Sequence, residues 1–342
     1  MRKKMVRRGL VMGAIALAAA AGIVSAQQKQ VNVLCSVTLP WCEALGPAFQ
    51  KDTGIKLNFV RLSTAEGLAR IRAEKANPTF DAWFGGTGDP HYEAWSNGLT
   101  TFYKVKEYEN LRRDLRFAVG LSYVPIYQGI LGIGINPNVF KAKNLPPVKC
   151  WSDLTKPAYK GQIQIANPNT SGTAYTFITT LITLMGEDKA FDLMAKMHPN
   201  VSEYTRSGVA PRVALGNGSA AIGIQFMHDM VEFKKQGFPI QIVSPCEGTG
   251  YEIGGLSLIK GTRNIDNAKA FMDWAVSPAA QSIGPKTGAY SLPSNTKTPV
   301  DDDTPNPKDF KLITLDAKKW GNPTVREPLI KRWTNEIFPL PR

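Results

Sequence analysis

Residues 219–261 read SAAIGIQFMHDM followed by VEFKKQGFPIQIVSPCEGTGYEIGGLSLIKG, and three apolar segments within them are typical of buried strands. We expect these strands at residues 220–225, 240–243 and 253–259. His228 and Asp229 come directly after the first strand, at the start of a predicted helix, and Glu252 ends the loop before the third. Ligands of open α/β sheets bind beyond the carboxyl ends of the strands. We therefore expect these three side chains to lie at such ends and to contact a small polar ligand.

The segments before this stretch alternate between strand and helix patterns. Strands are expected at 31–34, 55–60 and 80–84, with helices between them. Ser63 and Glu66 have the spacing of a capping box at the start of the second helix. This alternation predicts an α/β fold built on a doubly wound parallel sheet.

Residues 118–135 break this rhythm with long, glycine-interrupted apolar segments, where we expect the chain to cross into a second lobe. It would cross back after Glu252. The resulting domain prediction is a first lobe of residues 27–127 plus 255–342 and a second lobe of residues 128–254. The tail, residues 312–338, is expected to form a last helix or two that pack on the first lobe.

Hydroxyl side chains and glycines stand ahead of several predicted helices. Backbone N–H groups at helix N-termini bind phosphate well, especially beside hydroxyl donors and glycines that permit close approach. Any one of these residues alone is more simply a helix cap, worth about 1 kcal/mol, but five such segments on the facing rims of two lobes favour anion capture. Only Arg206 adds an arginine to a segment, so we expect capture to depend on helix dipoles and neutral donors. The residues are Ser36, Ser63, Thr64, Gly86, Thr87, Ser171, Gly172, Thr173, Ser207 and Gly208.

The N-terminus predicts a secretory signal peptide over residues 1–26, with a basic start, an apolar segment at 9–23 and a small-residue cleavage site ending at Ala26. Removing its five basic residues lowers the net charge from +13 to +8. A basic exported protein is consistent with an anionic ligand or simply with a solvated basic surface. The charges are scattered singly, which argues against nucleic-acid binding.

Four cysteines in an exported chain favour disulfides, and no CxxC motif indicates a zinc ribbon or a thioredoxin-type site. Three pairings are possible. We favour Cys35–Cys42, a local link across a strand–helix junction, together with Cys150–Cys246.

These features together resemble the periplasmic substrate-binding proteins of ABC importers. The late helix AKAFMDWAVSPAAQ at 268–281 is similar to that of the group first known for ferric iron. Within that group the resemblance is to the hexose-phosphate-binding members. It is carried by WFGGTGD at 83–89, NPNTSGTAY at 167–175, FMHD at 226–229 and CEGTGYEIG at 246–254.

The resemblance implies a bilobed type II, or Venus-flytrap, fold with two hinge crossovers. It implies that His228, Asp229 and Glu252 hold sugar hydroxyls, while the hydroxyl-bearing helix starts hold the phosphate. It also implies a periplasmic monomer that delivers its ligand to an inner-membrane permease driven by a cytoplasmic ATPase, with no cofactor, no resident metal and no nucleic-acid partner. Aromatic side chains weighed for stacking on the sugar are Trp83, Tyr175, Tyr204 and Tyr251.

The same residues could in principle bind ferric iron or another ligand, or catalyse hydrolysis. Ferric capture in the related group uses adjacent tyrosines where this chain has residues 226–229, and that pair is absent here. Inorganic phosphate or a phosphonate is an alternative ligand. A divalent metal bound by His228, Asp229 and Glu252 is another alternative. A secreted sugar-phosphate hydrolase would need a catalytic set, but the chain has no G-x-S-x-G, HExxH or P-loop motif. We therefore expect ligand binding without catalysis.

Overall fold

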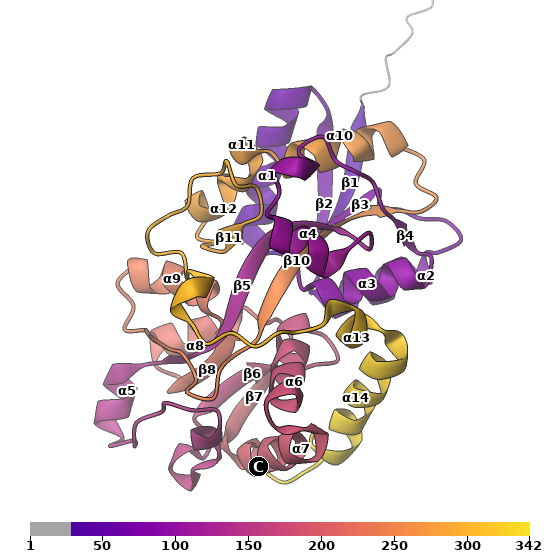
Figure 1. The fold of residues 1–342 in the computed structure, drawn as a ribbon. Coiled ribbons are helices and arrows are strands. Elements are labelled where there is room, and N and C mark those ends of the chain that lie inside the picture. The colour runs from indigo at the N-terminus through magenta and orange to yellow at the C-terminus, as the bar shows by residue number, and fades with distance from the viewer. Residues whose placement is uncertain (1–28) are drawn as a thin grey trace, which may run out of the picture.

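A computed structural model describes residues 29–342, so the predicted signal peptide at 1–26 lies outside the described residues (Figure 1). The strands are β1 (Gln30–Cys35), β2 (Lys56–Arg61), β3 (Ala82–Phe84), β4 (Thr100–Thr101), β5 (Val124–Ile135), β6 (Ile163–Ala166), β7 (Val201–Thr205), β8 (Ile222–Phe226), β9 (Gln241–Val243), β10 (Tyr251–Ile259) and β11 (Leu292–Pro293). The α-helices are α1 (Leu39–Thr53), α2 (Thr64–Ala73), α3 (Gly88–Ser96), α4 (Arg113–Val119), α5 (Pro137–Ala142), α6 (Gly172–Met185), α7 (Glu187–Met197), α8 (Pro211–Asn217), α9 (Met227–Lys235), α10 (Ile265–Ala275), α11 (Pro278–Gln281), α12 (Ile283–Lys286), α13 (Ala317–Gly321) and α14 (Pro323–Glu336).

Each lobe contains a small parallel sheet. In the first lobe β2, β1 and β3 are parallel neighbours, and in the second β8, β6 and β7 are. Strand–helix–strand connections place helices on the faces of such sheets. The predicted doubly wound α/β architecture is thus confirmed.

Strands β5 and β10 join the two lobes, and Figure 1 shows them side by side through the middle of the molecule. The first part of β5 pairs with β10, and its last part, residues 131–135, pairs with β8 of the second lobe. The end of β10 pairs with β3 of the first lobe. These two strands are the expected crossovers and complete the bilobed type II fold, although β5 is one continuous strand rather than two segments.

Each lobe has its own hydrophobic core. Trp41, Phe49 and Phe271 belong to the core of the first lobe, whereas Trp151 and Phe177 belong to that of the second. Separate cores let two lobes move as units about a hinge.

The C-terminal tail differs from our expectation. Trp320, Leu329 and Trp333 pack in the core of the second lobe, not of the first. Leu329 and Trp333 are four residues apart and therefore share one face of α14, and Trp333 packs edge-on against Tyr204, with ring centroids 5.0 Å apart. The tail also contacts the first lobe, as expected: a Cβ on Gly321 of α13 would lie 2.7 Å from Cβ of Tyr92 on α3, and Arg326 donates to Asp89 of the same helix. The lobe limits at residues 127 and 254 stay a prediction.

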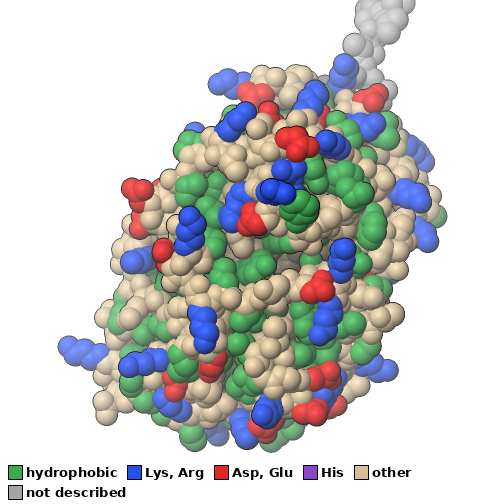
Figure 2. All heavy atoms as spheres, viewed as in Figure 1, with side chains coloured by type: hydrophobic (Ala, Val, Ile, Leu, Met, Phe, Trp, Pro, Cys, Tyr) green, Lys and Arg blue, Asp and Glu red, His purple; other side chains and the backbone are tan. Residues whose placement is uncertain are grey.

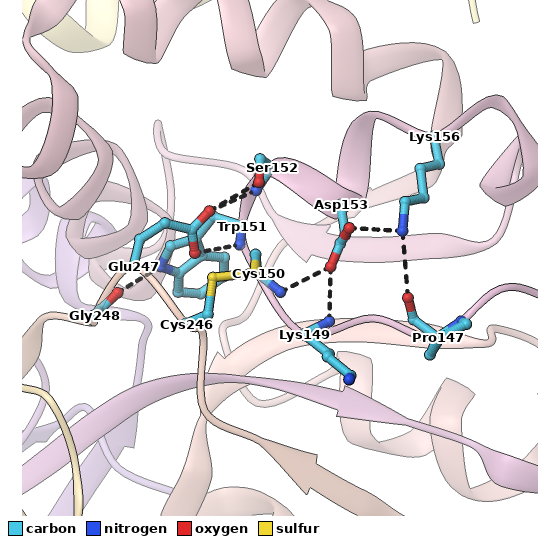
Figure 3. The surroundings of a disulfide bond; sticks show 10 residues. All are labelled: Pro147, Lys149, Cys150, Trp151, Ser152, Asp153, Lys156, Cys246, Glu247 and Gly248. Atoms are coloured by element: carbon cyan, nitrogen blue, oxygen red, sulfur yellow. Dashed lines mark hydrogen bonds and ion pairs between the residues drawn. A yellow bond between two sulfur atoms is a disulfide. The ribbon is translucent and has the colours of Figure 1, made fainter.

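Both favoured disulfides, Cys35–Cys42 and Cys150–Cys246, are present. The second ties the start of the second lobe to the loop that leads into β10 (Figure 3). Beside it, the Glu247 carboxylate accepts hydrogen bonds from the backbone N–H groups of Trp151 and Ser152, at 2.8 and 3.0 Å. This loop is therefore anchored at the base of a crossover strand.

The surface in Figure 2 carries Lys and Arg side chains spread singly, with Asp and Glu among them. Within residues 29–342, every helix is too short or too polar to cross a membrane.

Candidate ligand-binding site

A cavity between the two lobes brings together all but one of the predicted site residues. It is lined by Ser36, Val37, Thr38, Trp41, Arg61, Ser63, Thr64, Gly86, Thr87, Tyr127, Ser171, Thr173, Ser207, Gly208, Val209, Phe226, His228, Asp229, Glu252 and Ala289. The exception, Gly172, packs directly behind the lining residue Thr87.

These residues converge because the chain reaches the same sheet edge in both lobes. Ser36, Ser63 and Thr87 follow the carboxyl ends of β1, β2 and β3. The corresponding residues of the second lobe, Ser171, Ser207 and His228, follow β6, β7 and β8. Glu252 is different: it lies near the amino end of β10, not at the carboxyl end of a strand. It reaches the same edge because β10 runs antiparallel to β3.

Five helices begin at the cavity, because the N-cap residue of each lines it. These residues are Thr38 of α1, Ser63 of α2, Thr87 of α3, Ser171 of α6 and Phe226 of α9. Ser36 and Ser207 instead lie in loops, some residues before α1 and α8. They can offer hydroxyls, but not the N–H groups of a first helical turn.

The two lobes touch across the cavity. The Oγ of Ser63 donates to the backbone carbonyl of Thr170 at 2.7 Å, and Nη2 of Arg61 donates to the Oγ of Ser207 at 3.0 Å. The predicted capping box is present too, with Ser63 Oγ 2.6 Å from the Glu66 carboxylate. The lobes are therefore closed over the cavity.

Two glycines permit close contacts at the cavity, Gly86 within the first lobe and Gly172 between the lobes. Gly86 has a φ of +82°, and a Cβ there would lie 2.4 Å from Oγ1 of Thr64. A Cβ on Gly172 would lie 1.8 Å from Oγ1 of Thr87, on the opposite lobe. We expected Gly86 to help bind the phosphate, but its backbone N–H instead donates to the hydroxyl of Tyr127 at 3.1 Å.

His228, Asp229 and Glu252 form the acidic end of the cavity. Nε2 of His228 is 3.6 Å from Oδ1 of Asp229 and 3.8 Å from Oε1 of Glu252, so this one nitrogen is close to both carboxyl groups. Among the described residues, Nδ1 of His228, Nε1 of Trp41 and Oγ1 of Thr38 are buried without hydrogen-bond partners. Buried polar atoms are normally paired, so these three favour a polar ligand here.

A family model described as bacterial extracellular solute-binding protein matches residues 93–319. The chain belongs to this family. A curated relative from Haemophilus influenzae, itself described as an uncharacterized protein, is 41% identical over 324 residues, which is 93% of each chain.

Solved structures of similar solute-binding proteins agree with the fold. The periplasmic binding protein AfuA from Actinobacillus pleuropneumoniae, solved with exogenous fructose-6-phosphate bound, is 38% identical, with a TM-score of 0.87 over 92% of this chain and 100% of that one. Iron-bound HitA from Pseudomonas aeruginosa, 18% identical with a TM-score of 0.76 over 89% of this chain and 98% of that one, shares the fold. Relatives with a described role are transport proteins rather than enzymes, among them a spermidine/putrescine-binding periplasmic protein of Escherichia coli, 23% identical over 85% of each chain.

Burial shifts the ionisation of the acidic end of this solute-binding protein. Loss of hydration raises the pKa of Glu252 well above its usual range, and the charge of Asp229 raises it further. Burial also lowers the pKa of His228, against the opposing effect of Asp229. A protonated Glu252 donates a hydrogen bond, so this end offers both a donor and acceptors to ligand hydroxyls.

We expect Glu252→Gln to stabilise the ligand-free protein more at pH 8 than at pH 5. The unfolded Glu252 ionises near its ordinary pKa, whereas the folded carboxyl ionises only at higher pH, so wild-type stability falls as pH rises between the two values. Each unit of the difference is worth about 1.4 kcal/mol. Thermal unfolding of both proteins across this pH range measures the effect. A difference in melting temperature independent of pH would contradict it.

The sequence analysis missed Arg61, whose guanidinium lines the cavity. Its Nε donates to the backbone carbonyl of Val37 at 3.1 Å, and its Nη2 reaches Ser207. Burial lowers the pKa of Arg61, but an arginine side chain stays charged at neutral pH. The cavity wall therefore carries a full positive charge in addition to the helix dipoles and neutral donors that we expected. Arg206 instead pairs with Glu66 and is mostly exposed. Arg61 is the last residue of β2. It could therefore have been predicted by the same rule as Ser63, namely that polar residues at the carboxyl ends of the strands lie at the ligand-binding edge.

The aromatic lining also differs from the residues that we considered. Trp41, Tyr127 and Phe226 line the cavity, whereas Tyr175 and Tyr251 line a neighbouring cavity behind Glu252. Trp41 lies in the first turn of α1, where its spacing marked it only as an apolar core residue.

Proposed function

We propose that this solute-binding protein captures a hexose phosphate between its lobes for import. One observation carries the proposal: a single cavity between the lobes is lined both by phosphate-type donors and by partners for sugar hydroxyls. Neither set alone would distinguish a sugar phosphate from a free anion or a free sugar.

The phosphate would bind among the helix N-termini. The starts of α2, α3 and α6 supply partial positive charge and N–H groups. Arg61 adds a full charge, and hydrogen bonds from a guanidinium to a phosphate are stronger than those between neutral groups. The hydroxyls of Thr64, Thr87 and Thr173 complete the donors.

The sugar would bind at the acidic end. The Asp229 carboxylate can accept hydrogen bonds from sugar hydroxyls and a protonated Glu252 can donate one, and both groups lie close to Nε2 of His228, at 3.6 and 3.8 Å. Nδ1 of His228 and the indole N–H of Trp41 are the polar atoms that a ring oxygen or hydroxyl would satisfy.

Fructose-6-phosphate bound to AfuA supports this class of ligand, since the two chains are 38% identical over nearly their whole length. The transport role follows from the family: the protein would work in the periplasm after removal of residues 1–26 and release its ligand to an ABC permease in the inner membrane, driven by a cytoplasmic ATPase. It would work as a monomer and perform no chemistry on the ligand.

Thermal unfolding with a ligand panel tests the proposal. The purified protein is unfolded and refolded to strip bound ligand, then mixed with glucose 6-phosphate, fructose 6-phosphate, free hexoses, inorganic phosphate, a phosphonate and ferric citrate. A ligand at 100 times its Kd should add about 2.7 kcal/mol to stability. We expect shifts with hexose phosphates and none with free hexoses. A shift only with phosphate, phosphonate or iron would overturn the sugar assignment, and release of phosphate would overturn the absence of catalysis.

We expect Asp229→Ala to weaken hexose-phosphate binding about 10- to 100-fold, because each hydrogen bond to a charged acceptor is worth about 1.5–3 kcal/mol. The melting temperature of the ligand-free protein should change little, since within residues 29–342 the Asp229 carboxylate is paired only with His228. Isothermal titration measures the affinity. Asp192→Ala, which removes an exposed partner of Lys196 on α7, is the control. Equal losses of affinity and stability would show that Asp229 is structural.

A further inference from the structure

A buried cluster behind the cavity links the two helices whose N-termini face each other across the site. Helix α3 comes from the first lobe and α6 from the second, and their N-termini touch where Thr87 packs on Gly172. The distance between these N-termini decides whether both can contact one phosphate.

Arg326 of α14 lies between the same two helices. Its Nε donates to Oδ2 of Asp89 at 3.0 Å and its Nη1 to Oε2 of Glu93 at 3.3 Å, both on α3. Its guanidinium also lies over the ring of Tyr175 on α6, 5.1 Å from the centroid. Arg326 is only 5% exposed, so these contacts are shielded from solvent.

The surrounding contacts hold this arrangement in place. The Tyr175 hydroxyl donates to the backbone carbonyl of Trp320 at 2.8 Å, which ties α6 to α13. On the other side, a Cβ on Gly321 would lie 3.0 Å from the carbonyl of Asp89, so α13 also packs tightly on α3. Figure 1 shows α13 and α14, in yellow, along the side of the molecule next to α3.

We infer that Arg326 is a positioning residue of the ligand site: its contacts with Asp89, Glu93 and Tyr175 set the separation of the α3 and α6 N-termini that receive the anion. The cluster acts from behind, because Asp89 is in the first turn of α3, two residues after Thr87. Arg326 itself does not line the ligand cavity. The inference rests on the proposed function only for the identity of the ligand.

The test compares Arg326→Gln with Arg332→Gln, a matched change on the same helix. Arg332 pairs with Glu187, Asp188 and Glu336, none of which is on α3. With glucose 6-phosphate in isothermal titration, R326Q should raise the Kd about tenfold, as for residues coupled to a ligand that they do not touch, and R332Q should leave it unchanged. An unchanged Kd in folded R326Q would overturn the inference.

A double-mutant cycle separates positioning from a general loss of stability. If Arg326 acts through the N-terminus of α3, R326Q should cost less affinity once Thr87→Ala has removed a contact there. The affinity losses of R326Q and Asp229→Ala should instead be additive, because Asp229 lies on a different helix, α9. Additivity with T87A would contradict the inference. If R326Q does not fold, Asp89→Asn removes the same charge pair and should raise the Kd in the same direction.

Hydrogen exchange of the ligand-free protein gives a readout that does not depend on the ligand. R326Q should speed exchange in the peptides that cover both α3 and α6, whereas R332Q should affect only α14 and α7. If the wild type binds neither glucose 6-phosphate nor fructose 6-phosphate, the proposed ligand is wrong. Unchanged exchange in α3 and α6 would separately overturn the role of Arg326.

Discussion

Gly172→Ala is expected to weaken ligand binding about 10- to 100-fold, in line with an overpacking cost of roughly 1–3 kcal/mol, while leaving the ligand-free protein folded and stable. The Cβ of the new alanine would lie 1.8 Å from Oγ1 of Thr87 and 2.9 Å from Cβ of Thr87. Because Thr87 belongs to the other lobe, the clash arises when the lobes close. The open form can accommodate the methyl group, so the loss should be confined to the closed, liganded state. Isothermal titration and the contraction seen by small-angle scattering on adding ligand measure it.

Gly46→Ala is the control, since it also places alanine in a helix but a Cβ there would come no closer than 3.8 Å to its nearest neighbour. It should leave the affinity unchanged. Any gain in stability should be smaller than the usual value of about 1 kcal/mol for glycine to alanine in a helix, because a side chain directly before Pro47 is disfavoured in helical backbone. If G172A bound ligand and contracted as the wild type does, the Thr87–Gly172 contact would not limit closure.

Arg61→Gln is expected to weaken hexose-phosphate binding about 10- to 100-fold, because a charged hydrogen bond to phosphate is worth about 1.5–3 kcal/mol. Arg61 lines the cavity and, through Ser207, joins the lobes. The loss should shrink as salt screens the wild-type interaction. Titrations of both proteins at several salt concentrations measure it.

Arg206→Gln removes another arginine that reaches across the lobes, at Glu66, but its side chain is 78% exposed. Exposed ion pairs contribute at most about 1 kcal/mol, so its affinity should change by only a fewfold. Equal losses in the two variants would mean that Arg61 acts by holding the lobes together rather than by contacting phosphate.

The location of the site followed from local sequence patterns. Polar residues directly after apolar strands, such as Ser36, Thr87 and His228, were predicted to share one edge, and they line one cavity. This prediction succeeds because parallel strands of a wound sheet all end at the same edge. The capping box at Ser63 followed from residues three apart, and the disulfide Cys35–Cys42 from residues seven apart.

Other features depend on contacts between distant parts of the chain. Trp41 and Tyr127 had ordinary core patterns, and only the closed arrangement of the lobes places them at the ligand cavity. Glu252 reaches the site edge from the amino end of its strand because β10 runs antiparallel to β3.

The amino-acid sequence by itself determined the α/β class, the two crossovers and the edge at which the ligand site forms, because each depends on the periodicity and order of local segments. Only the tertiary structure decided that Leu329 and Trp333 join the core of the second lobe while Arg326 on the same helix reaches α3 of the first. An amphipathic helix such as α14 shows which of its faces is apolar, but not which of two available cores will bury that face.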